Sequence, residues 1–114
     1  MPPKHRVIHR KLVRDRIPAI ITTAGRTPLV RTLSPTAYRD ALLVKLREEL
    51  EEFSVSKEIA ELADLVEVVQ AIIEERGLVW GEFEALRAKK RRERGGFQDR
   101  VWLESAEQPE SSIE

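Results

Sequence analysis

The sequence contains no cysteine in 114 residues and no long apolar run. Without cysteine, disulfide bonds, zinc–thiolate sites and thiol nucleophiles are all excluded. No apolar stretch approaches the roughly 18 residues that a membrane-spanning helix needs. The basic start of the chain also lacks the apolar segment of a signal peptide. We therefore expect a cytoplasmic protein without a membrane partner.

Neither sign of charge is in excess, because 20 Lys and Arg residues balance 20 Asp and Glu residues. The net charge thus gives no general attraction to nucleic acid or membrane. Aromatic residues are only 5% of the chain, and none interrupts the basic run at 89–94, which argues against stacking on nucleic-acid bases. The charges are nevertheless segregated, with basic residues at 4–16 and 87–100 and carboxylates at 48–67. This separation suits a site in which an acidic cluster holds a metal and basic flanks hold an anion.

Capping signals divide the chain into helices. Asp15 to Gly25 predicts a short helix with Pro18 in its first turn, followed by a short strand or an extended arm at 27–33. Ser34 and Pro35 form a strong helix start, and the interruption at 54–56 predicts the end of that helix. A second long helix is expected over about 57–76, where Gly77 ends it. A third is expected over about 82–94, where Gly95 and Gly96 end it. The fold class is therefore mainly α, with short extended segments at 27–33 and 97–103.

Each long helix carries apolar residues every three or four positions, which is the pattern of one buried face. The predicted core comprises Tyr38, Leu42, Leu46, Leu50, Phe53, Ile59, Leu62, Val66, Val69, Ile73, Phe83 and Leu86. A chain this short buries only a modest core alone, so we expect a homodimer or higher oligomer, with Trp80 and Trp102 in core or dimer contacts. One domain over 1–104 and a disordered acidic tail over 105–114 are expected.

Paired carboxylates are the most informative feature. Glu49 and Glu52 are three residues apart, as are Glu61 and Asp64, so each pair shares a helix face. In one straight helix Glu49 and Asp64 would lie about 22 Å apart, too far to share an ion. In an antiparallel hairpin that turns near Ser56, Glu49 would lie opposite Asp64 and Glu52 opposite Glu61. All four carboxylates would then form one cluster.

Two carboxylates about 4 Å apart repel by about 4 kcal/mol at an effective dielectric of 20, so either some of them are protonated or a metal ion neutralises them. Oxygen ligands favour magnesium, or manganese as a substitute, and a water acidified by the metal can attack a phosphoanhydride. Glu48 is placed to orient or deprotonate that water. The alternative is a solvated Glu-rich helix face, with pairs such as Lys45 and Glu49, and the spacing alone leaves both interpretations open.

The chain also resembles the MazG-like, all-α NTP pyrophosphohydrolase superfamily, in its small phosphoribosyl-ATP pyrophosphohydrolase-like and house-cleaning branch. The resemblance covers about residues 8–104. Its four motifs are Lys11–Pro18, Glu48–Glu52, Glu61–Val68 and Arg94–Phe97. Two features depart from the pattern: the gap of eight residues between the paired carboxylates is short, and Trp80 and Gly81 stand where a hydroxyl cap is expected.

The resemblance implies an oligomeric helical bundle that cleaves nucleoside triphosphates between the α- and β-phosphates. It implies that Glu48 activates water and that four carboxylates bind magnesium, namely Glu49, Glu52, Glu61 and Asp64. Phosphoribosyl-ATP, in histidine biosynthesis, is the alternative substrate. A non-catalytic helical module whose Glu stripe binds a basic partner is the alternative outside enzymes.

Four basic residues are candidates for the substrate's phosphates. Lys90 and Arg94 precede Gly95 and Gly96, whose backbone amides can approach an anion closely, although a charge run is usually a solvated face. Lys11 and Arg14 are three apart and could reach a triphosphate. The competing interpretation is that these two pair with acidic residues such as Asp15 or with a partner subunit.

Overall fold

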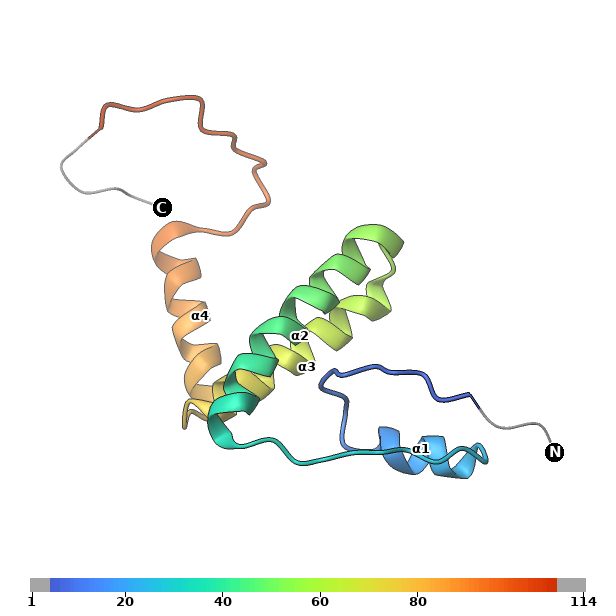
Figure 1. Ribbon diagram of the computed structural model, residues 1–114. Helices are drawn as coiled ribbons and strands as arrows, with labels where there is room; N and C mark the ends of the chain where they lie inside the picture. Colours follow the sequence, from blue (N-terminus) through green and yellow to red (C-terminus); the bar gives the residue numbers. More distant parts are fainter. Residues whose placement is uncertain (1–4, 109–114) are drawn as a thin grey trace. The chain divides into compact units, whose positions relative to one another are not determined.

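Four helices form in residues 5–108, which are the residues that the computed structural model describes. They are α1 (Ile17–Thr23), α2 (Pro35–Ser56), α3 (Ile59–Glu75) and α4 (Trp80–Arg94) (Figure 1). No strand occurs in this range, so the predicted all-α class is confirmed and residues 27–33 form an arm rather than a strand. The chain divides into two units, residues 1–80 and 81–114, which are described separately below. A single domain over 1–104 stays a prediction.

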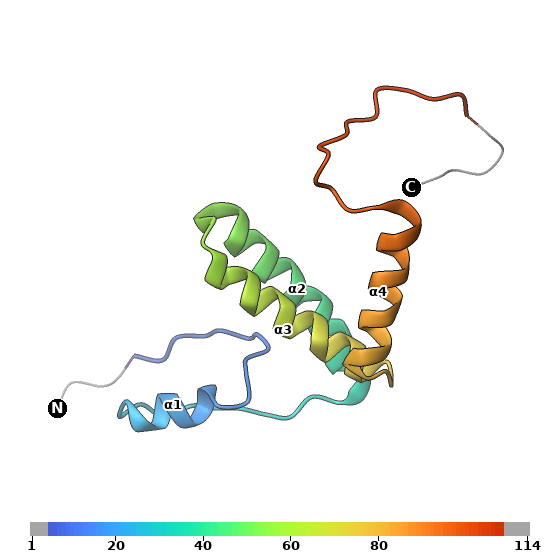
Figure 2. The ribbon, with the colours of Figure 1, turned by 180° about the vertical axis from the view of Figure 1, so that it is seen from behind.

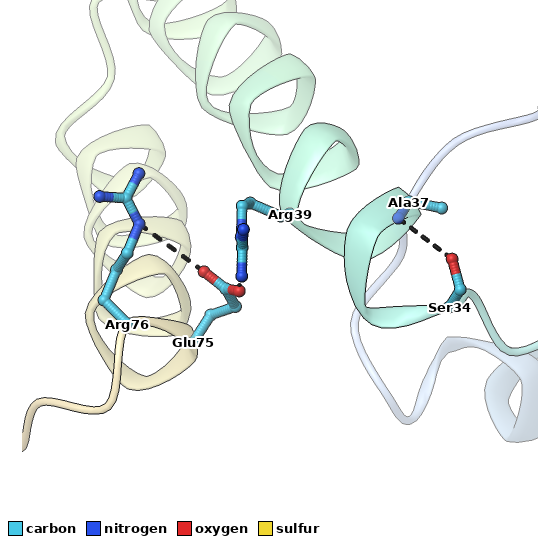
Figure 3. A network of polar contacts seen from close by, with 5 residues as sticks. All are labelled: Ser34, Ala37, Arg39, Glu75 and Arg76. Atoms are coloured by element: carbon cyan, nitrogen blue, oxygen red, sulfur yellow. Dashed lines mark hydrogen bonds and ion pairs between the residues drawn. The ribbon is translucent and has the colours of Figure 1, made fainter.

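The start of α2 follows the predicted capping chemistry. Ser34 has an extended backbone, and its Oγ accepts a hydrogen bond from the Ala37 amide at 3.2 Å (Figure 3). Pro35 occupies the first turn, where its missing N–H group has no helical partner to lose. These two residues fix the first turn of the longest helix in the described chain.

The end of α2 differs from the prediction, because the helix continues through residues 54–56. The Ser54 hydroxyl donates to the Leu50 carbonyl one turn earlier at 2.9 Å, so it is satisfied within the helix and does not break it. The chain turns instead at Lys57, whose φ of 59° is left-handed and whose amide donates to the Phe53 carbonyl at 2.7 Å. Ser56 still supports the turn, since its Oγ accepts from the Glu58 amide at 3.1 Å.

Helices α2 and α3 form the predicted antiparallel hairpin and lie side by side in both views (Figures 1 and 2). Gly77 ends the second arm with a φ of 82°, and its amide donates to the Glu74 carbonyl at 3.0 Å. At the end opposite the turn, Arg39 Nε on α2 lies 2.8 Å from Glu75 Oε1 on α3 (Figure 3). This ion pair links the start of α2 to the end of α3.

The buried face of α2 is rotated from the predicted one. Leu42 is buried, but Leu50 is 54% exposed, and Glu49 is buried in its place. Leu42, Leu46, Glu49 and Phe53 follow spacings of four, three and four, which is the narrow seam of two packed helices. The prediction continued the four-residue spacing of Leu42 and Leu46 to Leu50, and it therefore missed that Glu49 lies in the seam.

The buried face of α3 is also partly different from the predicted one. Val68 and Ile73 are buried, whereas Ile59 and Val66, both predicted to be in the core, are exposed. With Leu42, these are the three buried apolar residues among residues 5–108, so the hairpin core is small.

Residues 5–33 precede the hairpin within the same unit. Helix α1 begins with Pro18 in its first turn, as predicted, and ends before Gly25, whose φ is 81°. An irregular arm, residues 26–34, then leads to α2 (Figures 1 and 2).

The second unit consists of α4 and an irregular segment. Helix α4 begins at Trp80, slightly before the predicted start, and Gly95 follows its last turn with a φ of 85°. Leu86, predicted to be buried, is exposed, and Trp102 is 82% exposed in the segment that follows. Of the predicted disordered tail, residues 105–108 are irregular and 109–114 lie outside the described residues.

None of the helices in residues 5–108 combines the length and apolar character required to cross a membrane.

Candidate metal centre

Glu49 lies in the apolar seam of the hairpin with 5% of its surface exposed. Its Oε1 contacts the Lys45 ammonium at 3.3 Å, whereas its Oε2 is buried and has no hydrogen-bond partner among the described residues. Leaving a buried polar atom unpaired costs about 1–3 kcal/mol, and more when the group is charged. A carboxylate kept in this position therefore needs an explanation beyond packing.

Two carboxylates of α3 approach Glu49 across the hairpin. Glu49, Glu61 and Asp64 each offer an oxygen, and these three oxygens all lie within 4.8 Å of one another. Glu61 and Asp64 are only half-buried, so the group opens to solvent on the α3 side. We call these three residues the carboxylate cluster. It confirms that the predicted hairpin brings carboxylates of both helices together.

The fourth predicted ligand, Glu52, adjoins the cluster without belonging to it. Three residues of an α-helix turn the chain by about 300°, which is about 60° short of a full turn. Glu52 therefore points about 60° away from Glu49 around the helix axis. Because Glu49 points into the seam, this rotation carries Glu52 toward solvent, and its side chain is exposed. Its role as a metal ligand stays a prediction.

The electrostatics of Glu49 follow from its position. Burial raises the pKa of the Glu49 carboxyl, and the neighbouring Glu52 carboxylate raises it further. The contact with Lys45 acts in the opposite direction and lowers the pKa, but burial is the larger effect. The net shift is upward, so Glu49 resists ionisation unless a positive charge approaches.

Lys45 links the cluster to the predicted catalytic residue. Its ammonium lies 3.5 Å from Glu48 Oε2 as well as 3.3 Å from Glu49 Oε1, and its side chain is only 16% exposed. Sequence reasoning treated Lys45 as an ordinary surface pair of a helix. The missed signal is that Lys45 is four residues before Glu49, and Glu49 itself falls on the seam through Leu42 and Leu46.

A shallow groove of about 430 Å³ lies beside the cluster at the turn of the hairpin. Its lining is Glu48, Glu51, Glu52, Val55, Ser56 and Glu61. Glu61 is shared between the groove and the cluster, so a molecule in the groove would lie next to a metal on the cluster.

The predicted phosphate-binding residues fall into two groups. Arg14 donates from Nη2 to Asp64 Oδ1 at 2.7 Å, so it contacts the carboxylate cluster directly. Lys11 is exposed in the same segment. Lys90 and Arg94 are exposed on α4, in the second unit, and their contribution to phosphate binding stays a prediction.

The cluster has the chemistry of a site for a hard divalent cation. Its donors are three carboxylate oxygens from two helices, and the orphaned Glu49 Oε2 is a ready ligand. Magnesium and manganese both prefer such oxygen donors and keep water or phosphate oxygens in their remaining positions. The residues therefore fit a metal ion.

Comparison with known proteins gives one partial relative. The chain is 57% identical over 42 residues to an uncharacterized protein of Mycolicibacterium smegmatis. The matched stretch covers 37% of this chain and 43% of that protein, so it spans less than half of the relative's length. No protein-family model matches the chain, and no solved structure matches it.

Proposed function

We propose that this chain is a magnesium-dependent nucleoside triphosphate pyrophosphohydrolase of the MazG-like kind. The observation that carries the proposal is the buried Oε2 of Glu49, which has no hydrogen-bond partner in residues 5–108 and belongs to a carboxylate clustered with those of Glu61 and Asp64. The four motifs that resemble the MazG-like superfamily support the same function. Water would cleave the anhydride between the α- and β-phosphates and release a nucleoside monophosphate and pyrophosphate.

In this proposal each acidic residue of the hairpin has its own role. Glu49, Glu61 and Asp64 would hold the magnesium ion, and the exposed Glu52 would be a further ligand. The ion, when bound, would supply Lewis-acid polarisation of the phosphate oxygens and would make a nearby water more acidic. Glu48, which lines the groove, accepts the proton from the attacking water.

Lys45 positions Glu48 in the proposed mechanism. Its ammonium contacts Glu48 Oε2 at 3.5 Å and Glu49 Oε1 at 3.3 Å, which fixes the directions of both side chains. A proton acceptor needs this fixed orientation, because general-base catalysis depends on hydrogen-bonding distance to the reacting water.

Pyrophosphate release from a panel of substrates tests the function. The panel contains common and damaged nucleoside triphosphates and phosphoribosyl-ATP, each with magnesium and with EDTA. We expect magnesium-dependent release from at least one substrate. Glu48→Gln should lower kcat by about 100-fold or more, in line with the loss of a general base.

Glu58→Gln is the matched control for that variant. Glu58 is exposed at the hairpin turn, and its side chain makes no capping hydrogen bond. The activity of the Glu58→Gln variant should therefore equal that of the wild type. If no substrate yields pyrophosphate and the folded protein does not respond to magnesium, the hydrolase proposal fails. The non-catalytic helical module would then be the better interpretation.

The proposed enzyme is a homodimer or higher oligomer. Its hairpin exposes a second apolar stripe beside the seam, with Leu43 and Leu50 seven residues apart on α2 and Ile59 and Val66 seven apart on α3. Residues seven apart share a helix face, so each pair presents a continuous apolar strip that a second copy could cover. Light scattering should give a mass of at least two chains, and Leu50→Lys should reduce it. A wild-type monomer at micromolar concentration would contradict this assembly.

A further inference from the structure

Arg14 joins the segment before α1 to the carboxylate cluster. Its Nη2 lies 2.7 Å from Asp64 Oδ1, although the two residues are 50 positions apart in the sequence. Both side chains remain substantially exposed, at 54% for Arg14 and 42% for Asp64. A guanidinium therefore already occupies one oxygen of a carboxylate that is placed to bind a cation.

Within residues 5–108, two cationic side chains touch the cluster, and they are held very differently. Lys45 lies within α2, is 16% exposed and contacts two carboxylates. Arg14 lies in an irregular segment, and the structure gives it a contact with one carboxylate. If a divalent cation entered the cluster, both side chains would repel it, and Arg14 is the one whose position allows it to leave.

The Arg14 contact is also weak enough to exchange. An exposed ion pair contributes little to stability, because water screens both charges and ordering the side chains costs entropy. Residues 11–16 are not helical, and Lys11, Arg14 and Arg16 are exposed, while Leu12 and Val13 are half-buried. Breaking the ion pair would therefore loosen this segment without disturbing the hairpin.

We propose that Arg14 and a divalent cation compete for Asp64, so that cation binding releases Arg14 and residues 11–16 from α3. The released guanidinium then pairs with the substrate's phosphates, which the metal brings to the same place. Arg14 is thus a phosphate-binding residue whose release links metal binding to phosphate binding. This inference rests on the proposed metal site, and its first tests use the metal alone.

Metal affinity tests the competition directly. Manganese binding is measured by calorimetry without nucleotide for the wild type, Arg14→Gln and Arg16→Gln. Because the competing ion pair is exposed, we expect Arg14→Gln to bind manganese more tightly, by up to about fivefold. Arg16→Gln removes the same charge two residues away and should bind like the wild type. Equal or weaker binding by Arg14→Gln would mean that Arg14 supports Asp64, and would overturn the proposal.

Hydrogen exchange and trypsin cleavage test the release. Magnesium should slow amide exchange around Glu49 and Asp64 and should speed trypsin cleavage after Lys11 and Arg16 of the wild type. In Arg14→Gln, cleavage after these two residues should be rapid from the start and should not respond to magnesium. Protection of the hairpin without faster cleavage after Lys11 and Arg16 would overturn this inference while leaving the metal site standing. No binding heat and no protection anywhere would reject the metal site itself.

Kinetics test the second half of the proposal. Arg14→Gln should raise the KM for the nucleotide while binding the metal more tightly, and Arg14→Lys should restore part of the loss in KM. A purely structural role would not move these two quantities in opposite directions. An unchanged KM in Arg14→Gln would show that Arg14 does not reach the phosphates.

Discussion

Glu49 and Glu75 are two nearly buried carboxylates in one hairpin, and their surroundings are opposite. The side chain of Glu75 is 10% exposed, with Oε1 2.8 Å from Arg39 and Oε2 3.7 Å from Arg76 (Figure 3). The side chain of Glu49 is 7% exposed, with one oxygen near Lys45 and the other without a hydrogen-bond partner in the part of the chain that the structure describes. Glu75 faces positive charge on both oxygens, whereas Glu49 faces two more carboxylates.

The two carboxylates mark two ends of the hairpin with different tasks. We call the region of Arg39, Leu42, Ile73 and Glu75 the open end, and the region of Glu49, Glu61 and Asp64 the turn end. The open end combines two buried apolar residues with a satisfied ion pair. The turn end keeps like charges together, which lowers stability unless a cation binds. We therefore expect stability to be concentrated at the open end, where it can support an unfavourable arrangement at the turn end.

Truncation at the open end should have the largest effect on stability. Leu42→Ala removes one of the most buried side chains of the hairpin, so we expect a loss of about 2–5 kcal/mol in the free energy of unfolding. Urea denaturation followed by circular dichroism measures this loss. Leu29→Ala is the control, because Leu29 is 83% exposed and should change stability by no more than about 0.5 kcal/mol. Similar losses for both variants would show that the open end does not carry the stability.

Magnesium should stabilise the turn end by the next largest amount. A ligand that binds only the folded state adds about 2.7 kcal/mol at 100 times its Kd. We expect such a gain in the wild type and in Glu75→Gln, and its loss in Glu49→Gln. Urea midpoints in magnesium chloride and in EDTA, at equal ionic strength, measure the gain. If Glu49→Gln responded as strongly as the wild type, the metal would bind elsewhere.

The same substitution at the two ends should have opposite effects without metal. Glu75→Gln removes a charge that is matched by Arg39, so we expect a loss of about 1–3 kcal/mol. Glu49→Gln removes one of three clustered negative charges, so its stability should equal or exceed that of the wild type. Urea denaturation in EDTA at pH 7 compares them. A similar loss in both variants would remove the contrast between the two ends.

The sequence predicted the helices well where a local interaction decides the outcome. The cap at Ser34, Pro18 in the first turn of α1 and the glycine after α3 all act within a few residues, and all were found. The interruption at 54–56 was wrong because a serine hydroxyl can either compete with the helix or bond to the preceding turn. Ser54 does the latter, and its own sequence neighbourhood does not determine that choice.

The site was harder to predict, because it depends on packing between two helices. The carboxylate pairs were recognised by their spacing, but only the seam distinguishes buried Glu49 from exposed Glu52. From Leu46, a step of three residues along the helix places Glu49 in the seam, whereas a step of four would place Leu50 there. The packing of α2 against α3 decides between the two steps. The contact between Arg14 and Asp64 spans 50 residues, and no local pattern encodes it.

The smallest expected effect is a pH dependence that belongs to the turn end alone. Burial raises the pKa of Glu49 above its ordinary value of 4.5, so the metal-free folded protein keeps this proton at pH values where the unfolded chain has released it. The folded state then binds more protons, and stability must fall as pH rises from the ordinary pKa through the raised one. Glu49→Gln has no such proton, so the free energy of unfolding should fall less steeply over this range in EDTA.

Saturating magnesium should reverse the sign of that contribution. The metal needs the ionised carboxylate, so its stabilising effect increases as pH rises and Glu49 loses its proton. The difference in stability between wild type and Glu49→Gln should therefore fall with pH in EDTA and rise with pH in magnesium. Parallel curves for the two proteins in both buffers would mean that Glu49 is neither a strained carboxyl nor a metal ligand. Opposite slopes would tie the buried, unpartnered oxygen to the metal through a property that Glu75, matched by its arginines, does not share.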